Sequence, residues 1–244
     1  MITPQLAQLE RELALARLAL EDFTYSVSHD LRASLRHVNA YLRIAREDLG
    51  EDLDPAVASH LDTAAGAAAQ MGRLIDGLME LSRVDRASLQ TDAVDLGRLL
   101  AQIRDQLQPA SAGRDIRWTV AEDLPTVHGD LTLLAQMFHC LLDNAIQFTR
   151  KCPVANIDVQ WLRLGSGLCE LRIRDDGVGF DPRLQERLFR VFQRLHSEKE
   201  FDGVGIGLAL ARRVVERHGG SIRAEGETGK GCCISLSLPI AGAA

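Results

Sequence analysis

A repeat of apolar side chains in the N-terminal part restricts the fold of this chain more than any other feature. Its members are spaced alternately three and four residues apart: Leu6, Leu9, Leu13, Ala16, Leu20, Phe23 and Val27. Two steps of four then lead to Leu31 and Leu35, and the repeat resumes through Val38, Leu42, Ala45 and Leu49. Heptad spacing is typical of a helix that packs along a partner, and the double step changes the supercoil locally. We therefore expect one long helix with a helical partner.

The partner helix is predicted by the turn that follows. Gly50 is a typical helix stop, and Asp54 followed by Pro55 is a typical N-cap and first helical residue. Small and apolar residues then share one helical face: Val57, Leu61, Ala64, Ala68, Met71, Ile75 and Leu78. Two helices with apolar faces make half of a four-helix bundle, so a homodimer is expected. Residues 1–88 would be a coiled-coil entry helix and a dimerisation hairpin.

One histidine stands out on the first helix because of its neighbours. His29 lies between two seam positions and is expected to face outward. Asp30 can orient the imidazole or take its proton, and Arg32 and Arg36 lie roughly on the same side, where they can steady a phosphate. The plain alternative is a surface histidine of a coiled coil. No functional role is predicted for the other histidines, which lack metal-ligand spacing: His37, His60, His128, His139, His196 and His218.

The second half of the 244-residue chain mixes strand and helix patterns. Residues 86–95 are polar and aperiodic and are predicted to be a linker. Beyond them, helices are predicted at 95–107, 130–148 and 207–218, and strands at 116–120, 157–164, 168–174, 222–224 and 232–238. The last two strands look antiparallel. The predicted fold class is therefore an all-α hairpin, forming a dimeric four-helix bundle, followed by an α/β sandwich at residues 95–244.

Two glycine clusters indicate a nucleotide site in this second domain. Asp175 to Gly179 follows a strand directly, and Gly203 to Leu208 directly precedes a helix. Glycines let backbone amides approach phosphates, and a helix N-terminus favours negative charge. Asp175 can accept a hydrogen bond from an exocyclic amine, and Asn144 offers an oxygen to a magnesium ion. Either cluster alone is a weak signal, but the ordered set of all three is specific.

Composition and charge argue against several other classes. A formal net charge of -6 and a pI near 5.7 argue against a nucleic-acid binder. An apolar run of about 18 residues is lacking, so no membrane segment is expected, and charges interrupt any signal-peptide core. Five cysteines without C-x-x-C spacing indicate free thiols: Cys140, Cys152, Cys169, Cys232 and Cys233. Free thiols are typical of a reducing cytoplasm, where we expect the protein to reside.

Together these motifs resemble the transmitter module of a sensor histidine kinase, over about residues 20–239. Ser28 to Arg32 resembles the phosphoacceptor box, and Asp143 to Thr149 resembles the asparagine box. The two glycine clusters resemble the two glycine boxes, and Phe189 and Phe192 resemble the phenylalanine box. The run from Phe192 to His196 is similar to the phytochrome-like branch of the family.

The resemblance implies a Bergerat-type ATP-binding fold, a dimeric bundle and a two-step reaction of an ATP-dependent protein-histidine kinase. ATP with Mg²⁺ would phosphorylate His29, with Asp30 as its catalytic neighbour, and a response-regulator receiver domain would then take the phosphoryl group. Asn144 would hold Mg²⁺, and Asp175 would bind adenine under a lid formed by residues 180–203. The nucleotide-binding residues implied are Asn144, Gln147, Arg150, Lys151, Asp175, Gly177, Gly179, Phe189, Phe192, Gly203, Gly205, Gly207 and Leu208. The input would come from an upstream sensor domain or a partner protein.

Several positions depart from the family pattern in the nucleotide site. Gln147 replaces a lysine that would meet phosphate, although Arg150 or Lys151 can compensate. Unusual residues also stand at three further positions, Cys140, Asp176 and Val204. We therefore expect weaker ATP binding or slower turnover than is usual for the family.

Two departures lie beside the phosphoacceptor. Ser34 stands where a proline usually kinks the first helix, so this helix should be straighter. Ala33 stands where members with strong phosphatase activity carry a polar residue, so little phosphatase activity is expected.

Two alternatives to an active kinase remain open. A dimeric phosphotransfer protein or pseudokinase scaffold would keep His29 without using ATP, as Cys140 and Gln147 would favour. A Bergerat-fold ATPase of the chaperone or topoisomerase kind is disfavoured, because Cys140 stands where those enzymes would hold the glutamate that activates water.

Overall fold

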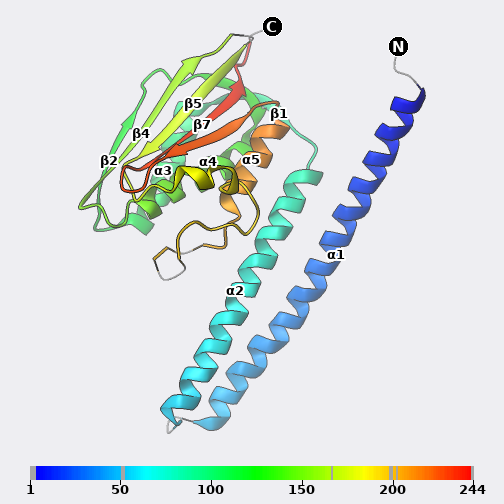
Figure 1. Cartoon of the computed structure of the whole chain (residues 1–244), viewed down its shortest axis with the longest axis vertical. Coiled ribbons are helices and arrows are strands. Elements are labelled where there is room, and N and C mark those ends of the chain that lie inside the picture. The colour runs from blue at the N-terminus through cyan, green and yellow to red at the C-terminus, as the bar shows by residue number, and fades with distance from the viewer. Residues whose placement is uncertain (1–3, 51–52, 166, 198–199, 202, 243–244) are drawn as a thin grey trace. The chain divides into compact units, whose positions relative to one another are not determined.

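The computed structural model describes residues 4–50, 53–165, 167–197, 200–201 and 203–242. The chain divides into two compact units, Met1–Arg86 and Ala87–Ala244. The first unit is a pair of antiparallel helices, and the second is a sheet covered by helices (Figure 1). None of the helices in the described part of the chain combines the length and apolar character needed to cross a membrane.

The first unit consists of α1 (Pro4–Leu49) and α2 (Pro55–Arg86). Helix α1 runs without interruption through the double step of the seam and through Ser34, as the sequence predicts. The predicted turn is also confirmed. Gly50 has a φ of 72°, which ends α1, and the Asp54 carboxylate accepts a hydrogen bond from the Ala56 amide at 2.8 Å, which caps α2.

Ion pairs hold α1 and α2 in one antiparallel register. They join Asp22 to Arg86, Arg32 to Asp76 and Arg46 to Asp62. The two residue numbers add to 108 in each pair, so one alignment holds from one end of the hairpin to the other. Packing agrees with this alignment, because a Cβ at Gly72 would lie 3.3 Å from the buried side chain of Leu35.

Part of the predicted seam stays uncovered within a single chain. On α1 the exposed apolar residues include Phe23, Val27, Leu31 and Val38, and on α2 they include Met71. Met71 was predicted to lie on the same apolar face as Ala68, which is buried. The hairpin therefore buries one side of its apolar surface and leaves a second side open to water.

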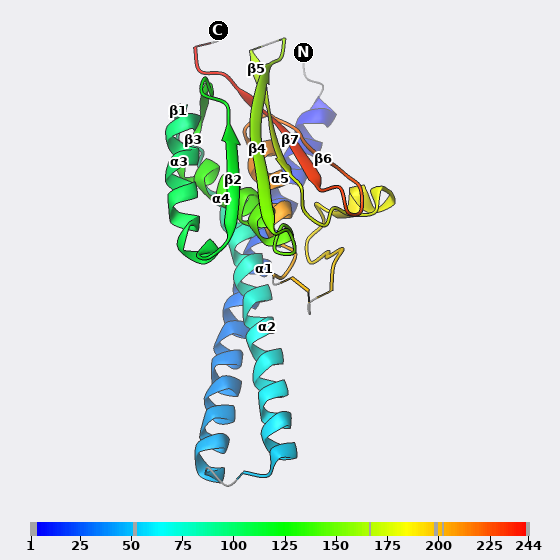
Figure 2. The same ribbon diagram turned by 90° about the vertical axis from the view of Figure 1, so that its left-hand side faces the viewer.

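The second unit is built on a five-stranded sheet in the order β2-β4-β5-β7-β6. All neighbours are antiparallel except β2 and β4, which are parallel. Helices α3, α4 and α5 cover one face of the sheet (Figures 1 and 2). The bounds are α3 Leu96–Leu107, β2 Asp115–Val120, α4 Leu131–Phe148, β4 Val154–Arg163, β5 Leu168–Asp175, α5 Gly207–Arg217, β6 Ile222–Gly226 and β7 Cys232–Pro239, with short 3₁₀ helices η1 Pro109–Ser111 and η2 Pro182–Arg187. The predicted α/β sandwich is thus confirmed.

The polar segment at residues 86–95 is not the irregular linker that we predicted. Its second half forms β1 (Thr91–Asp95), which pairs antiparallel with β3 (Thr126–Asp130). Val94 is buried opposite Val127 in this pair. The strand depends on a partner strand whose paired residues lie 31 to 39 positions later, so a local pattern could not show it.

Short polar caps position the helices that carry the site. Asp95 caps α3 through the Arg98 amide at 3.0 Å, and Asp130 caps α4 through the amides of Thr132 and Leu133. His218 then fixes the start of α4 to the end of α5. Its Nδ1 donates to the Val214 carbonyl at 2.7 Å, and its Nε2 accepts from the Asp130 amide at 2.9 Å. This buried histidine is structural.

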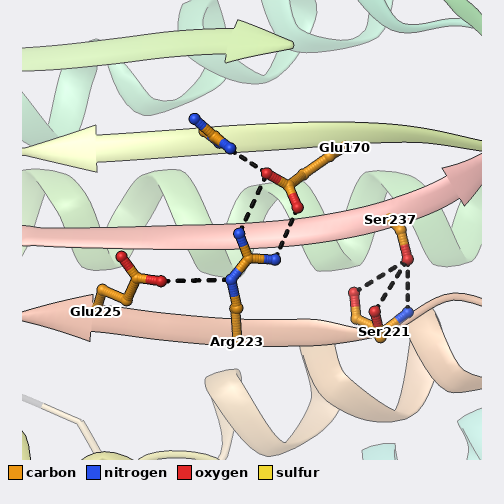
Figure 3. A network of polar contacts seen from close by, with 6 residues as sticks. Glu170, Ser221, Arg223, Glu225 and Ser237 are labelled. Atoms are coloured by element: carbon orange, nitrogen blue, oxygen red, sulfur yellow. Dashed lines mark hydrogen bonds and ion pairs between the residues drawn. The ribbon is translucent and has the colours of Figure 1, made fainter. Parts of the chain in front are cut away.

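The face of the sheet that the helices leave open carries a charged network (Figure 3). Glu170 on β5 accepts hydrogen bonds from Arg223 on β6 and from Arg172, with shortest distances of 2.7 Å. The Arg223 hydrogen bonds are the main reason that the pKa of Glu170 is lowered. Ser221 and Ser237 bond to each other beside this network at 3.1 Å. Hydrogen bonds and ion pairs therefore satisfy the polar side chains on this face of the sheet, which α3, α4 and α5 do not cover.

Candidate functional site: an exposed histidine and a nucleotide cradle

His29 lies exposed on α1 and contacts the carboxylate that follows it. Its Nδ1 lies 3.2 Å from Oδ1 of Asp30, and both side chains are more than half exposed. A carboxylate at Nδ1 favours the tautomer that keeps a proton there, which leaves the Nε2 lone pair free for attack. The structure thus agrees with the prediction that His29 faces outward.

The surroundings of His29 differ from the expectation in one respect. Arg32 and Arg36 were both expected to be available for an incoming phosphate, but Arg32 forms an ion pair with Asp76 of α2. That guanidinium therefore helps to hold the hairpin. Arg36 is exposed. Ser34 donates to the Asp30 carbonyl at 3.1 Å, a bond that the proline usual at this position could not form.

Asp175 lies at the end of β5 with its carboxylate almost fully buried. Its Oδ1 accepts from the Gly177 amide at 2.9 Å, and the Cys232 amide of β7 also donates to the carboxylate. Burial raises the pKa of Asp175 to about 6, more than these two hydrogen bonds lower it. A carboxylate can accept more than two hydrogen bonds, so Asp175 has lone pairs that these two amides do not use. This buried acceptor therefore suits a further donor such as an exocyclic amine.

The first glycine cluster is packed too closely for side chains. A Cβ at Gly177 would lie 2.5 Å from the Phe148 carbonyl oxygen, and one at Gly179 would lie 2.0 Å from the Glu227 carbonyl oxygen. Gly179 also has a φ of 59°. The fold itself requires these two glycines, so their presence does not by itself show a ligand.

The second glycine cluster differs, because part of it has space to spare. A Cβ at Gly205 would lie 2.6 Å from the Gln193 carbonyl oxygen. In contrast, one at Gly207 would meet Cys140 only at 3.5 Å and Nδ2 of Asn144 at 4.0 Å, and around Gly203 the described part of the chain places no atom within 4 Å. These are ordinary distances or open space, and they leave room for a ligand.

The N-terminus of α5 adds hydrogen-bond donors at this open place. Its N-cap is Ile206, whose apolar side chain offers no acceptor to the first turn. The first amides of a helix lack intrahelical partners, and the helix dipole favours an anion there. Asn144 of α4 lies beside Gly207, so its side-chain amide would lie near a phosphate that binds at this place. Leu208 follows Gly207 in the first turn and is half-buried.

These residues fit an adenine nucleotide with magnesium. Mg²⁺ usually takes one or two protein oxygens together with phosphate oxygens and water, which a single asparagine beside a phosphate cradle can supply. Among the described residues, histidine, cysteine, aspartate and glutamate form no cluster of three or more that could hold a metal ion. A magnesium ion here would thus bind through Asn144 and the phosphates.

Near position 147, where the family usually has a lysine, Gln147 and Lys151 both bind to acidic residues of the protein. Gln147 donates from Nε2 to Asp143 at 2.7 Å along α4. Lys151 forms an ion pair with Glu200 at 2.6 Å, so its ammonium group is already partnered. Arg150 lies in the turn after α4 and is exposed.

The two phenylalanines of the predicted lid have different settings. Phe189 is half-buried, whereas Phe192 is exposed and has a φ of 62°. The Phe192 amide donates to the Gly205 carbonyl at 2.9 Å. A positive φ costs free energy in a residue other than glycine. The middle of this segment is therefore held in a strained conformation against the second glycine cluster.

Asp176, one of the unusual residues of the predicted nucleotide site, binds to the neighbouring strand. Its carboxylate accepts from the backbone amide of Asn156 at 2.9 Å and from the Asn156 side chain at 2.5 Å. It therefore ties the end of β5 to β4, and two neutral amide donors already occupy this carboxylate. Sequence reasoning also missed Cys232, whose amide reaches Asp175 only because β7 pairs with β5.

Comparison with known proteins agrees with this division. The His Kinase A (phospho-acceptor) domain family matches residues 19–87, and the family of histidine kinase-, DNA gyrase B-, and HSP90-like ATPases matches residues 129–242. Cyanobacterial phytochrome A of Nostoc sp. is 31% identical over 98% of this chain and 31% of its own length. The methanogenesis regulatory histidine kinase FilI of Methanothrix harundinacea is 32% identical over 90% of this chain and 24% of its own.

A solved structure contains the same two folds in the same order along the chain. Full-length ShkA, crystallised with AMPPNP, is 24% identical and superposes with a TM-score of 0.64 over 90% of this chain and 46% of its own. The fold and the two family matches define a helix pair of the phospho-acceptor kind, followed by an α/β domain of the ATPase kind. The chain belongs to the sensor histidine kinases, as a transmitter module. It spans about a quarter to a third of the length of the curated relatives named above.

Proposed function

We propose that this chain phosphorylates its own His29 from ATP and passes the phosphoryl group to an aspartate of a response-regulator receiver domain. The observation that carries the proposal is the open place at the α5 N-terminus, where Gly207 adjoins Asn144. The fold does not require a glycine at position 207, because a Cβ there would make only ordinary contacts. Close approach of a phosphate would require one. The exposed pair of His29 and Asp30 supplies the acceptor.

Each part of the nucleotide has a matching group in the second unit. Asp175 would accept from the adenine amine, and the amides at Gly203, Gly205 and Gly207 would bind phosphates. Asn144 would hold Mg²⁺, which when bound neutralises phosphate charge. Catalysis then depends on positioning, because phosphoryl transfer needs an in-line approach of the attacking atom.

The chemistry at the acceptor follows from the His29 tautomer. The Nε2 lone pair forms a bond to the γ-phosphorus, the bond between that phosphorus and the bridging oxygen breaks, and ADP leaves. Asp30 keeps the proton on Nδ1 and stabilises the positive charge that develops on the ring. In the second step a receiver carboxylate oxygen attacks the same phosphorus, and the imidazole leaves.

Pairing of two chains would complete the helical bundle. The exposed seam on α1 would pack against the same seam of a second copy, because a C₂ interface uses one patch on both partners. The result would be a homodimer.

A second candidate function has a specific observation in its favour. Gln147 bonds to Asp143, and Lys151 pairs with Glu200, so the cations that would meet phosphate are few. A phosphotransfer protein that uses a neighbour's phosphoryl group would tolerate this arrangement. It would keep His29 and the dimer and would make no use of ATP.

Radiolabelled ATP distinguishes the two candidates. We expect label on the wild-type chain, none on His29→Ala, and little on Asn144→Ala. His37→Ala is the matched control, since it removes an exposed histidine from the same helix and should keep the label. Label that reaches His29 only from a phosphorylated receiver domain would instead support the phosphotransfer protein.

A further inference from the structure

We infer that His196 is a positioning residue of the nucleotide site, which fastens the lid segment to the first glycine cluster. The inference deepens the proposed function and rests on it for the identity of the ligand. The contact itself is a property of the nucleotide-free chain. The sequence alone predicts no functional role for this histidine.

The contact is a hydrogen bond between a lid side chain and a glycine-loop carbonyl. Nε2 of half-buried His196 lies 2.9 Å from the Gly179 carbonyl oxygen. Because a carbonyl oxygen only accepts, the ring must carry its proton on Nε2. Gly179 cannot move far, since the Glu227 and Gly231 carbonyl oxygens crowd its α-carbon. The bond therefore fixes the lid to a rigid point.

Aromatic packing fixes the same ring from two other sides. The His196 ring centroid lies 5.4 Å from that of Phe148, at the end of α4, and 5.3 Å from that of Phe201, in the lid. The two phenylalanine rings lie 5.1 Å apart, and Phe201 is only 3% exposed. Centroid distances in this range are typical of favourable aromatic pairs.

Charged groups strengthen the anchor at Phe201. Lys151 pairs with Glu200 at 2.6 Å and lies 5.5 Å from the Phe201 ring centroid. Arg194 donates to the Phe201 carbonyl at 2.5 Å. Lys151 thus ties the lid at Glu200 and Phe201 to the turn that follows α4, while the Arg194 bond joins two parts of the lid itself.

His196 contacts Gly179, Phe148 and Phe201, which belong to the first glycine cluster, to α4 and to the lid. Gly179 belongs to the first glycine cluster, and Phe148 ends the helix that carries Asn144. The lid segment then continues to the second cluster at Gly203. Because His196 bonds to the loop and stacks on the helix, its loss should loosen all three relative to one another. Its effect on ATP would be indirect, through geometry.

Two substitutions separate the hydrogen bond from the stacking. His196→Phe keeps an aromatic ring and loses the donor, whereas His196→Gln keeps a donor of similar reach and loses the ring. His128→Phe is the matched control, because His128 is exposed on β3 away from the lid sequence. Hydrogen exchange of the nucleotide-free full chain gives a readout that does not depend on kinase activity.

We expect His196→Phe to speed amide exchange in residues 175–181 and 189–201 and to weaken AMPPNP binding roughly three- to tenfold, the usual loss for one hydrogen bond. His196→Gln keeps a donor for Gly179 and loses only the ring contacts, so residues 175–181 should exchange more slowly in it than in His196→Phe. His128→Phe should match wild type. Unchanged exchange in His196→Phe would overturn the inference. A wild-type chain that binds no nucleotide would contradict the proposed function. The exchange experiment would still decide whether His196 fastens the lid to Gly179.

Discussion

Asp175 on β5 lies directly opposite Cys232 on β7, and the Cys232 amide donates a hydrogen bond to its carboxylate. This pair places a buried acid at the end of a strand, where burial raises its pKa to about 6. An ionised carboxylate that remains partly unsatisfied in a dry site is costly in the free protein. A ligand that donates a hydrogen bond to this carboxylate would offset that cost.

The raised pKa of Asp175 predicts how stability changes with pH. The folded-state pKa lies above the unfolded value of 3.8, so the favourable contribution is complete below about pH 4 and is lost as pH rises through about 6. A shift of this size corresponds to about 2–3 kcal/mol of unfolding free energy. Urea unfolding at pH 5 and pH 7.5 can be followed by tryptophan fluorescence, because Trp118 and Trp161 both lie in the second unit.

Asp175→Asn supplies the comparison. The variant should lack this part of the pH dependence, so its stability relative to wild type should improve between pH 5 and pH 7.5. Equal pH dependence in the two proteins would contradict a buried, titrating Asp175.

The glycines predict a separation of folding from binding. Gly177→Ala should destabilise the second unit by about 1–3 kcal/mol, because its Cβ would lie 2.5 Å from the Phe148 carbonyl oxygen. Gly207→Ala should change stability by no more than about 1 kcal/mol, since its Cβ has ordinary contacts. It should nevertheless weaken AMPPNP binding, measured by calorimetry, because the new methyl group fills the space beside Asn144. Undiminished binding in Gly207→Ala would show that phosphate does not approach this place.

The uncovered seam predicts the oligomeric state. Val38→Glu places a charge on the exposed apolar face of α1 and should shift a wild-type dimer toward monomer in sedimentation equilibrium. Arg36→Glu is the control, because Arg36 lies on the opposite side of α1 and its substitution should leave the dimer intact. A wild-type protein that sediments as a monomer would argue against the bundle.

The residue after the phosphoacceptor box predicts the balance of activities. Wild type should dephosphorylate a phosphorylated receiver domain slowly, because Ala33 offers no group to align a water molecule. Ala33→Thr should raise that rate roughly tenfold or more, the range in which a positioned polar group aids proton transfer. Ala40→Thr, one heptad further along the same face, should not. Fast dephosphorylation by wild type would contradict the prediction.

Features set by short-range rules were predicted correctly, and those set by distant partners were not. The cap at Asp54 and the stop at Gly50 depend on a few neighbouring residues, so their types were informative. By contrast, β1 exists because of β3, and Asp176 is occupied by Asn156. No local pattern shows which distant side chain will meet a given charge.

The same limit applies to the candidate site. The glycine clusters could be found from spacing, but that Gly177 serves the fold while Gly207 leaves space depends on what packs against each. Lys151 looked free for phosphate because Glu200, its partner, lies in a segment without regular structure. Residue types and their spacing therefore predicted where the candidate site lies, and packing distinguished the roles of the residues within it.

The single register of the helical hairpin has a mechanical consequence. The ion pairs from Asp22–Arg86 at one end to Arg46–Asp62 at the other share one alignment, so sliding α1 along α2 by one turn would break all of them together. Bending or rotating the two helices as one body breaks none. A push or twist applied to α1 would therefore move the whole hairpin, including Arg86 at its end. That movement would be passed to the next residue, Ala87, where the second unit begins.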